Sequence, residues 1–217
     1  MTRVVFLASG GGGTMRFLHR CIQEGRLPDF ELVGVVADRD CGALTYAGAN
    51  GLPHRQIHYR RDDNAAMLAT LAEWRPDVVI TNIHRILDAE LVATYRGKLV
   101  NLHYSLLPAF KGLIGVEPVR QALAHGCRFV GTTVHLVEEE VDAGPIVAQS
   151  VVPVTTDDLD ALMDQVFRSG CLNLLNALQA LGRGEPPPGA EPPGWSFSPA
   201  PAFAPSAFGE AFWGALR

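Results

Sequence analysis

Apolar residues in the first half of the chain follow two alternating patterns. Four short runs are almost wholly apolar and rich in Val and Ile, as strands covered on both faces are: residues 4–8, 32–37, 78–81 and 99–102. Between them, residues 15–24 and 63–74 carry apolar side chains at helical spacing. Strands that alternate with helices predict a parallel α/β sheet with right-handed crossovers.

The pattern changes after residue 127. Residues 128–137 and 145–154 form two β-branched runs, joined by a short segment that contains Asp142, and this arrangement predicts a hairpin. A long amphipathic helix is expected over residues 157–181, with Thr156 or Asp157 as its cap. The fold class predicted is therefore α/β, with a mixed sheet that is mostly parallel and has an antiparallel C-terminal portion.

Residues 184–217 differ in composition from residues 1–183. The segment is rich in proline, as linkers are, but it also carries six Trp and Phe residues. A solvated tail does not usually contain so much aromatic surface. We interpret it as a tail that straps over its own core. A homodimer contact and a cover for the active site are the alternatives.

Composition and charge exclude several classes of function. The net charge is -5 and no block of Lys or Arg occurs, so no nucleic-acid partner is indicated. No stretch approaches the roughly 20 apolar residues that span a bilayer, and the first apolar run is too short for a signal peptide. The four cysteines lack the spacing of a zinc or redox motif. We expect a soluble, cytoplasmic protein that needs no metal.

A glycine loop follows the first apolar run and opens the first helix. Glycines let backbone N–H groups approach an anion, and a helix N-terminus favours negative charge, so a phosphate or carboxylate is expected there. A tight turn that binds nothing is the alternative. A dinucleotide site is disfavoured, because Asp38 lies 28 residues beyond Gly10 rather than about 20. The loop residues concerned are Gly10, Gly11, Gly12, Gly13 and Thr14.

Asn101 and His103 stand at the end of the fourth apolar run. In a parallel α/β sheet, ligands bind at the carboxyl ends of strands, and residues two apart on a strand point to the same side. An amide beside an imidazole can stabilise an oxyanion or move a proton. Taken alone, a histidine at a strand end is more often structural, and Asp142 is common turn chemistry.

Three motifs in order change this interpretation. They are Asn-x-His-x-Ser-Leu-Leu-Pro at 101–108, Gly-Thr-Thr-Val-His at 131–135 and Val-Asp-Ala-Gly-Pro-Ile-Val at 141–147. Together with the glycine loop they resemble the folate-dependent formyltransferase family, over residues 3 to about 182. In its size and Ser-Gly-x-Gly start, the chain is most similar to the branch that formylates glycinamide ribonucleotide. The resemblance implies a Rossmann-like formyltransferase fold with residues 1–183 as the catalytic domain.

The resemblance also implies the chemistry. The co-substrate is 10-formyltetrahydrofolate, and the acceptor is an amine of a small molecule. Asn101 and His103 would bind the formyl oxygen and stabilise the tetrahedral intermediate. Asp142 would assist proton transfer and favour the imidazolium form of His103. The donor is expected against His84, Arg85, Ile86, Leu87, Val137, Glu138 and Val141, and the acceptor against the glycine loop and Ser105. His135 is interpreted as a hydrogen-bonded core residue.

The last helix departs from the family. Phe167, Gly170 and Cys171 stand where, by the resemblance, polar residues contact a ribonucleotide, so the acceptor stays open between glycinamide ribonucleotide and another small amine. A hydrolase that uses water as acceptor, a folate- or nucleotide-binding protein without turnover, and a nicotinamide-dependent oxidoreductase are the other hypotheses.

Overall fold

The computed structural model describes residues 1–183, 196–198 and 201–216. Its strands hydrogen-bond in the order β3-β2-β1-β4-β5-β6-β7-β8. The chain divides into two compact units: Met1–Asn101 with Val137–Glu139, and Leu102–Leu136 with Glu140–Arg217. Strands up to β5 pair parallel, whereas β6, β7 and β8 pair antiparallel, which confirms the predicted mixed sheet.

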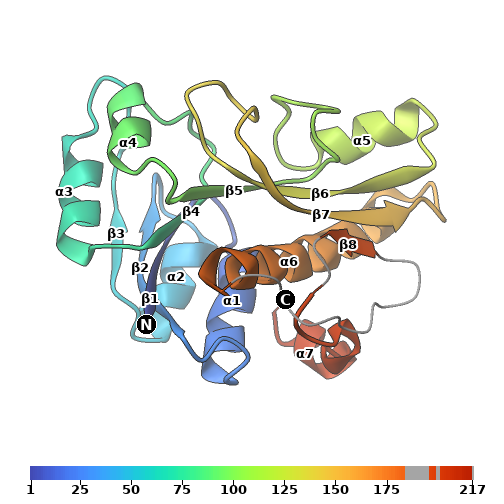
Figure 1. The fold of residues 1–217 in the computed structure, drawn as a ribbon, viewed down its shortest axis with the longest axis horizontal. Helices are drawn as coiled ribbons and strands as arrows, with labels where there is room; N and C mark the ends of the chain where they lie inside the picture. Colours follow the sequence, from blue (N-terminus) through green and yellow to red (C-terminus); the bar gives the residue numbers. More distant parts are fainter. Residues whose placement is uncertain (184–195, 199–200, 217) are drawn as a thin grey trace. The chain divides into compact units, whose positions relative to one another are not determined.

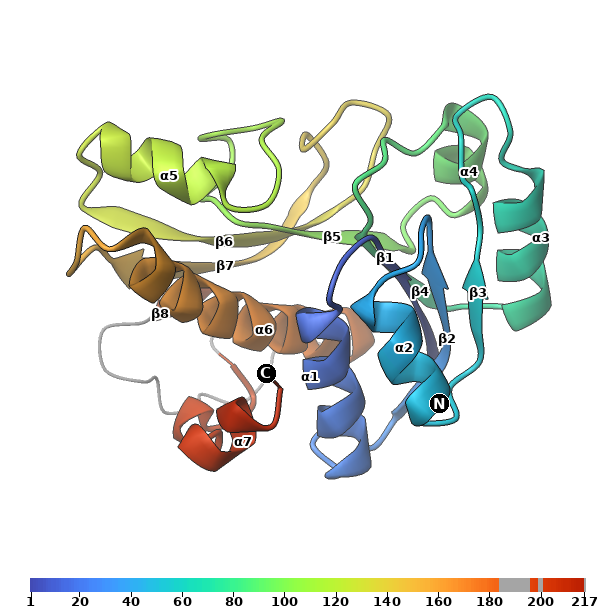
Figure 2. The same ribbon diagram turned by 180° about the vertical axis from the view of Figure 1, so that it is seen from behind.

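The first unit is a parallel sheet with helices on both faces. Helices α1 and α2 cover one face, and α3 and α4 cover the other (Figures 1 and 2). Its strands are β1 (Thr2–Ala8), β2 (Phe30–Ala37), β3 (His54–Gln56), β4 (Val78–Asn82) and the start of β5 (Leu99–His103), and its helices are α1 (Gly13–Gln23), α2 (Gly42–Ala49), α3 (Ala65–Trp74) and α4 (Ala89–Thr94).

The strands of the first unit form its core because they are apolar on both faces. Val5 and Leu7 of β1 pack with Met67 and Leu71 of α3, and Leu91 adds α4 to the same cluster. All five side chains are completely buried. The continuous apolar runs in the sequence therefore correspond to strands sandwiched between helices.

The second unit is built around an antiparallel hairpin. Strand β6 pairs with β7, and α6 packs against both strands. Val119 of α5, Val130 of β6, Val152 of β7 and Leu162 of α6 belong to one buried cluster. The unit contains the end of β5, then α5 (Glu117–Ala124), β6 (Phe129–Leu136), β7 (Ile146–Pro153), α6 (Leu159–Arg183), β8 (Ser196–Ser198), a 3-10 turn (Pro205–Ala207) and α7 (Glu210–Gly214).

Helix α6 follows the predicted apolar face, but its start differs from the prediction. The carboxylate of Asp158 accepts hydrogen bonds from the backbone N–H groups of Asp160 and Ala161 at 2.9 and 3.2 Å. It therefore satisfies donors that a helix start leaves free. The prediction of Thr156 or Asp157 as the cap is wrong. The hydroxyl of Thr156 instead accepts from the N–H of Asp158.

The described part of the tail packs on the second unit. Strand β8 pairs with β7, and Phe197 is 7% exposed. Arg168 of α6 forms an ion pair with Glu210 of α7, and its guanidinium lies over the ring of Trp213 at 5.5 Å. Residues 184–195, part of the predicted tail, lie outside the described residues. The tail thus covers its own chain where it is described, and contact with a second copy stays a prediction.

No helix within the described parts of the chain is long and apolar enough to cross a membrane.

Candidate active site

His103 at the end of β5 lies beside Asp142 in the loop between β6 and β7. Nδ1 of His103 is 3.5 Å from Oδ2 of Asp142. Nε2 of His135 is 3.6 Å from the other carboxylate oxygen, which exceeds a hydrogen-bond distance. The two imidazoles are 6% and 2% exposed. The structure thus brings the two predicted residues His103 and Asp142 together. His135 is the hydrogen-bonded core residue that the sequence predicts, since it is buried and its Nδ1 lies 2.8 Å from the carbonyl oxygen of Leu136, and its other ring nitrogen faces Asp142.

Burial controls the protonation of His103. Desolvation lowers the pKa of the ring below 6.5, because it disfavours the charged form. Asp142 and the carbonyl of Phe110 raise the pKa, while His135 lowers it, and burial outweighs the first two. The ring is therefore neutral at pH 7 in the free protein. Asp142 acts in the predicted direction, since it favours the imidazolium, but burial has the larger effect on the pKa of the ring.

Two acceptors flank the His103 ring. Nε2 lies 3.3 Å from the carbonyl oxygen of Phe110, and Nδ1 faces the carboxylate of Asp142. A neutral imidazole has one N–H and can donate to only one of them, whereas an imidazolium satisfies both. The contacts of the ring therefore suit the imidazolium, whereas burial favours the neutral form.

Asp142 carries a negative charge at neutral pH. Burial tends to raise the pKa of its carboxyl, but interactions with His135, the N–H of Gly112 and His103 together hold the pKa below 3.8. The Gly112 N–H donates to Oδ2 at 2.8 Å. Asp142 has a left-handed backbone with φ 53°, which Asp tolerates better than most residues.

Asn101 is engaged with a neighbouring strand. Its Nδ2 donates to the carbonyl of Thr81 at 2.7 Å and lies 3.2 Å from the Thr81 hydroxyl. The amide is half-buried on β5. Its donors therefore already have partners in the free protein, and a formyl oxygen would have to compete with Thr81 for them.

The loop after His103 is held by a buried threonine. The hydroxyl of Thr133 donates to the carbonyl of Ser105 at 2.7 Å and accepts from the N–H of Leu107 at 3.0 Å. Nε2 of Gln149 donates to the Leu107 carbonyl and to the Thr133 hydroxyl. The hydroxyl of Ser105, expected to contact substrate, is buried and donates to the carbonyl of Ala109. Ser105 therefore closes this loop, which contains the cis peptide Leu107–Pro108.

The glycine loop caps α1 without a side chain. Gly12 is the N-cap residue, with φ 73°, and a Cβ there would lie 2.8 Å from the Cβ of Ala43. A Cβ on Gly10 or Gly11 would meet no atom within 4 Å. Gly12 is therefore required by the fold, whereas the structure gives no packing reason for Gly10 and Gly11. Space beside them suits the close approach of a ligand.

The expected donor-binding residues of the first unit have mixed surroundings. Arg85 pairs with the buried carboxylate of Asp38 at 2.8 Å, and the N–H of His84 donates to the hydroxyl of Ser9. Leu87 lies in the core, whereas Ile86 is 51% exposed. An exposed apolar side chain of this kind fits one face of a flat heterocycle.

The expected donor-binding residues of the β6–β7 loop also differ from one another. Val137 packs partly against the core of the first unit, while Glu138 is exposed. Val141, next to Asp142, is 39% exposed. Val141 is thus the apolar side chain of this loop that is free to contact a donor.

The departures on α6 are mainly packing positions. A Cβ on Gly170 would lie 3.0 Å from the ring of Tyr104, and Cys171 is completely buried. Phe167 lines a cavity of about 360 Å³ with Arg168 and Trp213. Gly170 and Cys171 therefore face the interior of the second unit.

No group of three His, Cys, Asp or Glu side chains suited to hold a metal ion occurs among the described residues.

The family model that matches this chain is that of formyl transferases, and two similar proteins are also formyltransferases. The formyl transferase family model matches residues 2–177. Phosphoribosylglycinamide formyltransferase of Mycobacterium tuberculosis is 36% identical over 188 residues, which cover 82% of this chain and 84% of that protein. The chloroplastic enzyme of that name from Vigna unguiculata is 33% identical over 164 residues, 72% of this chain, which spans only 53% of the plant protein's length.

Comparison with solved structures indicates the same family. Phosphoribosylglycinamide formyltransferase from Bacillus halodurans superposes with a TM-score of 0.76 at 28% identity, covering 83% of this chain and 95% of that one. The family model covers well over half of the residues, and the relatives share both sequence and fold. The chain therefore belongs to the formyl transferase family.

Proposed function

We propose that this protein transfers the formyl group of 10-formyltetrahydrofolate to the amine of glycinamide ribonucleotide, with Asn101, His103 and Asp142 as its catalytic residues. The observation that carries the residue roles is the buried contact of a neutral imidazole with a charged carboxylate at the end of β5. The relatives that carry the name phosphoribosylglycinamide formyltransferase support the choice of acceptor.

His103 acts as a proton carrier in this mechanism. The bound co-substrate supplies the formyl group. As the amine nitrogen forms its bond to the formyl carbon, neutral His103 accepts the proton that this nitrogen must lose. The Asp142 carboxylate, which faces Nδ1, stabilises the resulting imidazolium, and Nε2, which lies 3.3 Å from the Phe110 carbonyl oxygen, is the nitrogen that exchanges the proton with the substrates. His103 then returns the proton to the folate nitrogen as the bond between that nitrogen and the formyl carbon breaks.

In this mechanism, Asn101 donates a hydrogen bond to the formyl oxygen. It precedes His103 by two residues on an extended strand, so both side chains leave β5 on the same side. Negative charge develops on the formyl oxygen during attack, and the amide donors of Asn101 stabilise it once they turn from Thr81.

The acceptor's phosphate is assigned to the glycine loop. The first N–H groups of α1 begin at the Gly12 cap, and no side chain caps them. Gly10 and Gly11 leave room for an anion beside them. Ile86 and Val141 are the side chains assigned to the folate ring. Cys21, Cys41, Cys127 and Cys171 form no disulfide in the described part of the chain, which fits a cytoplasmic location.

Release of tetrahydrofolate tests the proposal. Every mixture contains the protein and 10-formyltetrahydrofolate. Parallel mixtures also contain glycinamide ribonucleotide, another small amine, or no amine. We expect release with glycinamide ribonucleotide only. Release without amine would identify a hydrolase, and release with another amine would reassign the acceptor. If no mixture releases product and calorimetry detects no folate binding, the proposal is wrong.

A further inference from the structure

The segment of residues 110–112 contacts the proposed catalytic pair at two points. The Phe110 carbonyl faces Nε2 of His103, and the N–H of Gly112 donates to Asp142. Phe110 and Gly112 both have left-handed backbones, with φ 59° and 78°. The segment therefore follows no regular helix or strand, and contacts outside its own backbone must hold it in place.

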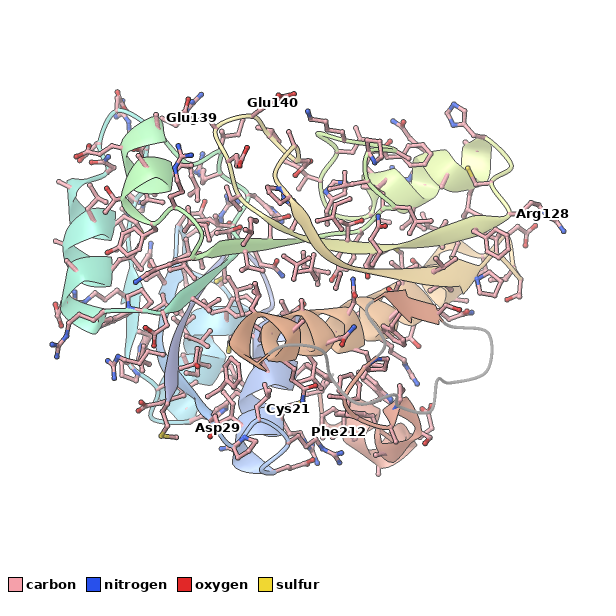
Figure 3. All side chains as sticks on the ribbon, in the orientation of Figure 1. Cys21, Asp29, Arg128, Glu139, Glu140 and Phe212 are labelled. Carbon is pink, nitrogen blue, oxygen red and sulfur yellow. The ribbon has the colours of Figure 1, made fainter. Side chains whose placement is uncertain are left out.

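Lys111, in the middle of this segment, pairs with the loop that carries Asp142. Its Nζ lies 2.5 Å from Oε1 of Glu140. Glu140 precedes Asp142 by two residues, and its carbonyl accepts from the N–H of Ala143 at 3.3 Å, which closes a turn around Asp142 (Figure 3 labels Glu140). The ion pair and the hydrogen bond from Gly112 thus both link residues 110–112 to the loop that contains Glu140 and Asp142.

We infer that Lys111 is a positioning residue for Asp142. Its ion pair with Glu140 holds residues 110–112 against the Asp142 turn, so that the N–H of Gly112 stays on the carboxylate. This inference rests on the proposed catalytic role of Asp142. Lys111 itself touches neither the carboxylate nor, in this role, the substrate.

The expected effect is modest because the pair is exposed. The side chains of Lys111 and Glu140 are 35% and 76% exposed, and exposed ion pairs make small, salt-sensitive contributions. We expect kcat to fall about threefold when the pair is broken, with KM for both substrates unchanged. The Gly112 hydrogen bond lowers the pKa of Asp142, so loosening it moves any acid limb set by Asp142 to higher pH.

The test compares Lys111→Met, Lys111→Arg and Glu140→Gln with a matched control. Arg120 and Glu117 form another exposed pair, at 3.1 Å, in the same unit, so Arg120→Met removes a comparable charge away from Asp142. We expect Lys111→Met and Glu140→Gln to lower kcat equally, the double variant to lower it no further, and Lys111→Arg to restore it. Arg120→Met should match the wild type, and high salt should bring the wild type towards Lys111→Met.

Each other outcome counts against the inference. An unchanged kcat in Lys111→Met, a loss that Arg does not restore, or a loss that Arg120→Met shares would overturn it. A rise in KM confined to Lys111→Met would assign Lys111 to substrate binding instead. If Lys111→Met lowers the melting temperature, the kcat of Glu140→Gln is compared with that of the wild type instead. No turnover by the wild type would refute the proposed function, which is a different result from normal turnover by all variants.

Discussion

Substitution of Gly11 by Ala separates ligand binding from folding. The added methyl group meets no atom within 4 Å, and the backbone of Gly11 does not have a positive φ. Alanine at a position with compatible backbone angles stabilises a protein by about 0.4–1 kcal/mol, because it restricts the unfolded chain. The same methyl group enters the space that we assign to the acceptor's phosphate. We therefore expect unchanged or slightly higher stability and a KM for glycinamide ribonucleotide raised about ten- to hundredfold.

Two other glycines set the scale for this comparison. Gly25, just after α1, has open space but φ 69°, so Gly25→Ala should cost about 1–2 kcal/mol through its backbone alone. Gly12 has φ 73° and would crowd Ala43 at 2.8 Å, and overpacking adds about 1–3 kcal/mol. The free energy of unfolding should therefore decrease in the order Gly11→Ala, Gly25→Ala, Gly12→Ala.

Urea unfolding and steady-state kinetics measure the two effects independently. Gly25→Ala controls for destabilisation, since it should lower the urea midpoint without a change in the KM for the acceptor. The KM for 10-formyltetrahydrofolate should stay constant in Gly11→Ala. If Gly11→Ala binds the acceptor like the wild type, the glycine loop does not hold the phosphate. If it unfolds as readily as Gly12→Ala, the fold rather than the ligand requires this glycine.

Further predictions concern the proposed catalytic pair, the buried carboxylate of Asp38 and the core. Asp142→Asn should lower kcat by about 10²–10⁴ in a stopped-flow assay, since it removes the charge that stabilises the imidazolium. If neutral His103 is the proton acceptor, the acid limb of kcat/KM should lie below pH 6.5, because burial lowers the pKa of the ring; a limb above 6.5 would contradict this. Asp38→Asn should reduce the loss of stability that the wild type shows below pH 3.8, since burial raises the Asp38 pKa but hydrogen bonds from Arg39, Ser9 and Arg85 outweigh it and hold the pKa below that value. Leu162→Ala should reduce the free energy of unfolding by about 2–5 kcal/mol in urea, because Leu162 is completely buried.

The long apolar patterns identified the main elements of the fold. Each of the four runs became a buried strand, and Leu162, Val166 and Leu175 of α6 are completely buried as their spacing predicted. Shorter elements gave no such signal. Helix α2 is rich in Ala and Gly, and β3 has three exposed residues, so neither shows the periodicity of an amphipathic element. These elements form because they pack against a sheet whose position the sequence does not reveal locally.

The sequence indicated that His103 and Asp142 could lie close together, but it did not indicate the protonation state of the ring. His135 belongs to a strand, in which neighbouring residues alternate between faces, and its place there predicted a hydrogen-bonded core residue. A register shift between Val134 and His135 interrupts that alternation, and a bulge of this kind can redirect a side chain towards a site. The protonation of His103 depends on how far burial outweighs Asp142, and both are properties of the folded chain. No local sequence pattern indicates the burial of His103 or its distance from Asp142.

The backbone at Asp142 decides which substitution can test its charge. With φ 53°, residue 142 needs a side chain that accepts the left-handed conformation, and Asn does so almost as readily as Asp. Alanine would strain the turn and displace the Gly112 contact together with the carboxylate, so any loss of activity would have two causes. Asparagine keeps an oxygen for the Gly112 N–H, removes the charge and replaces the oxygen that faces His135 by an NH2 group. In the proposed mechanism, neutral His103 needs that charge only after it has accepted a proton, so Asp142→Asn should lower kcat far more than it weakens the binding of either substrate.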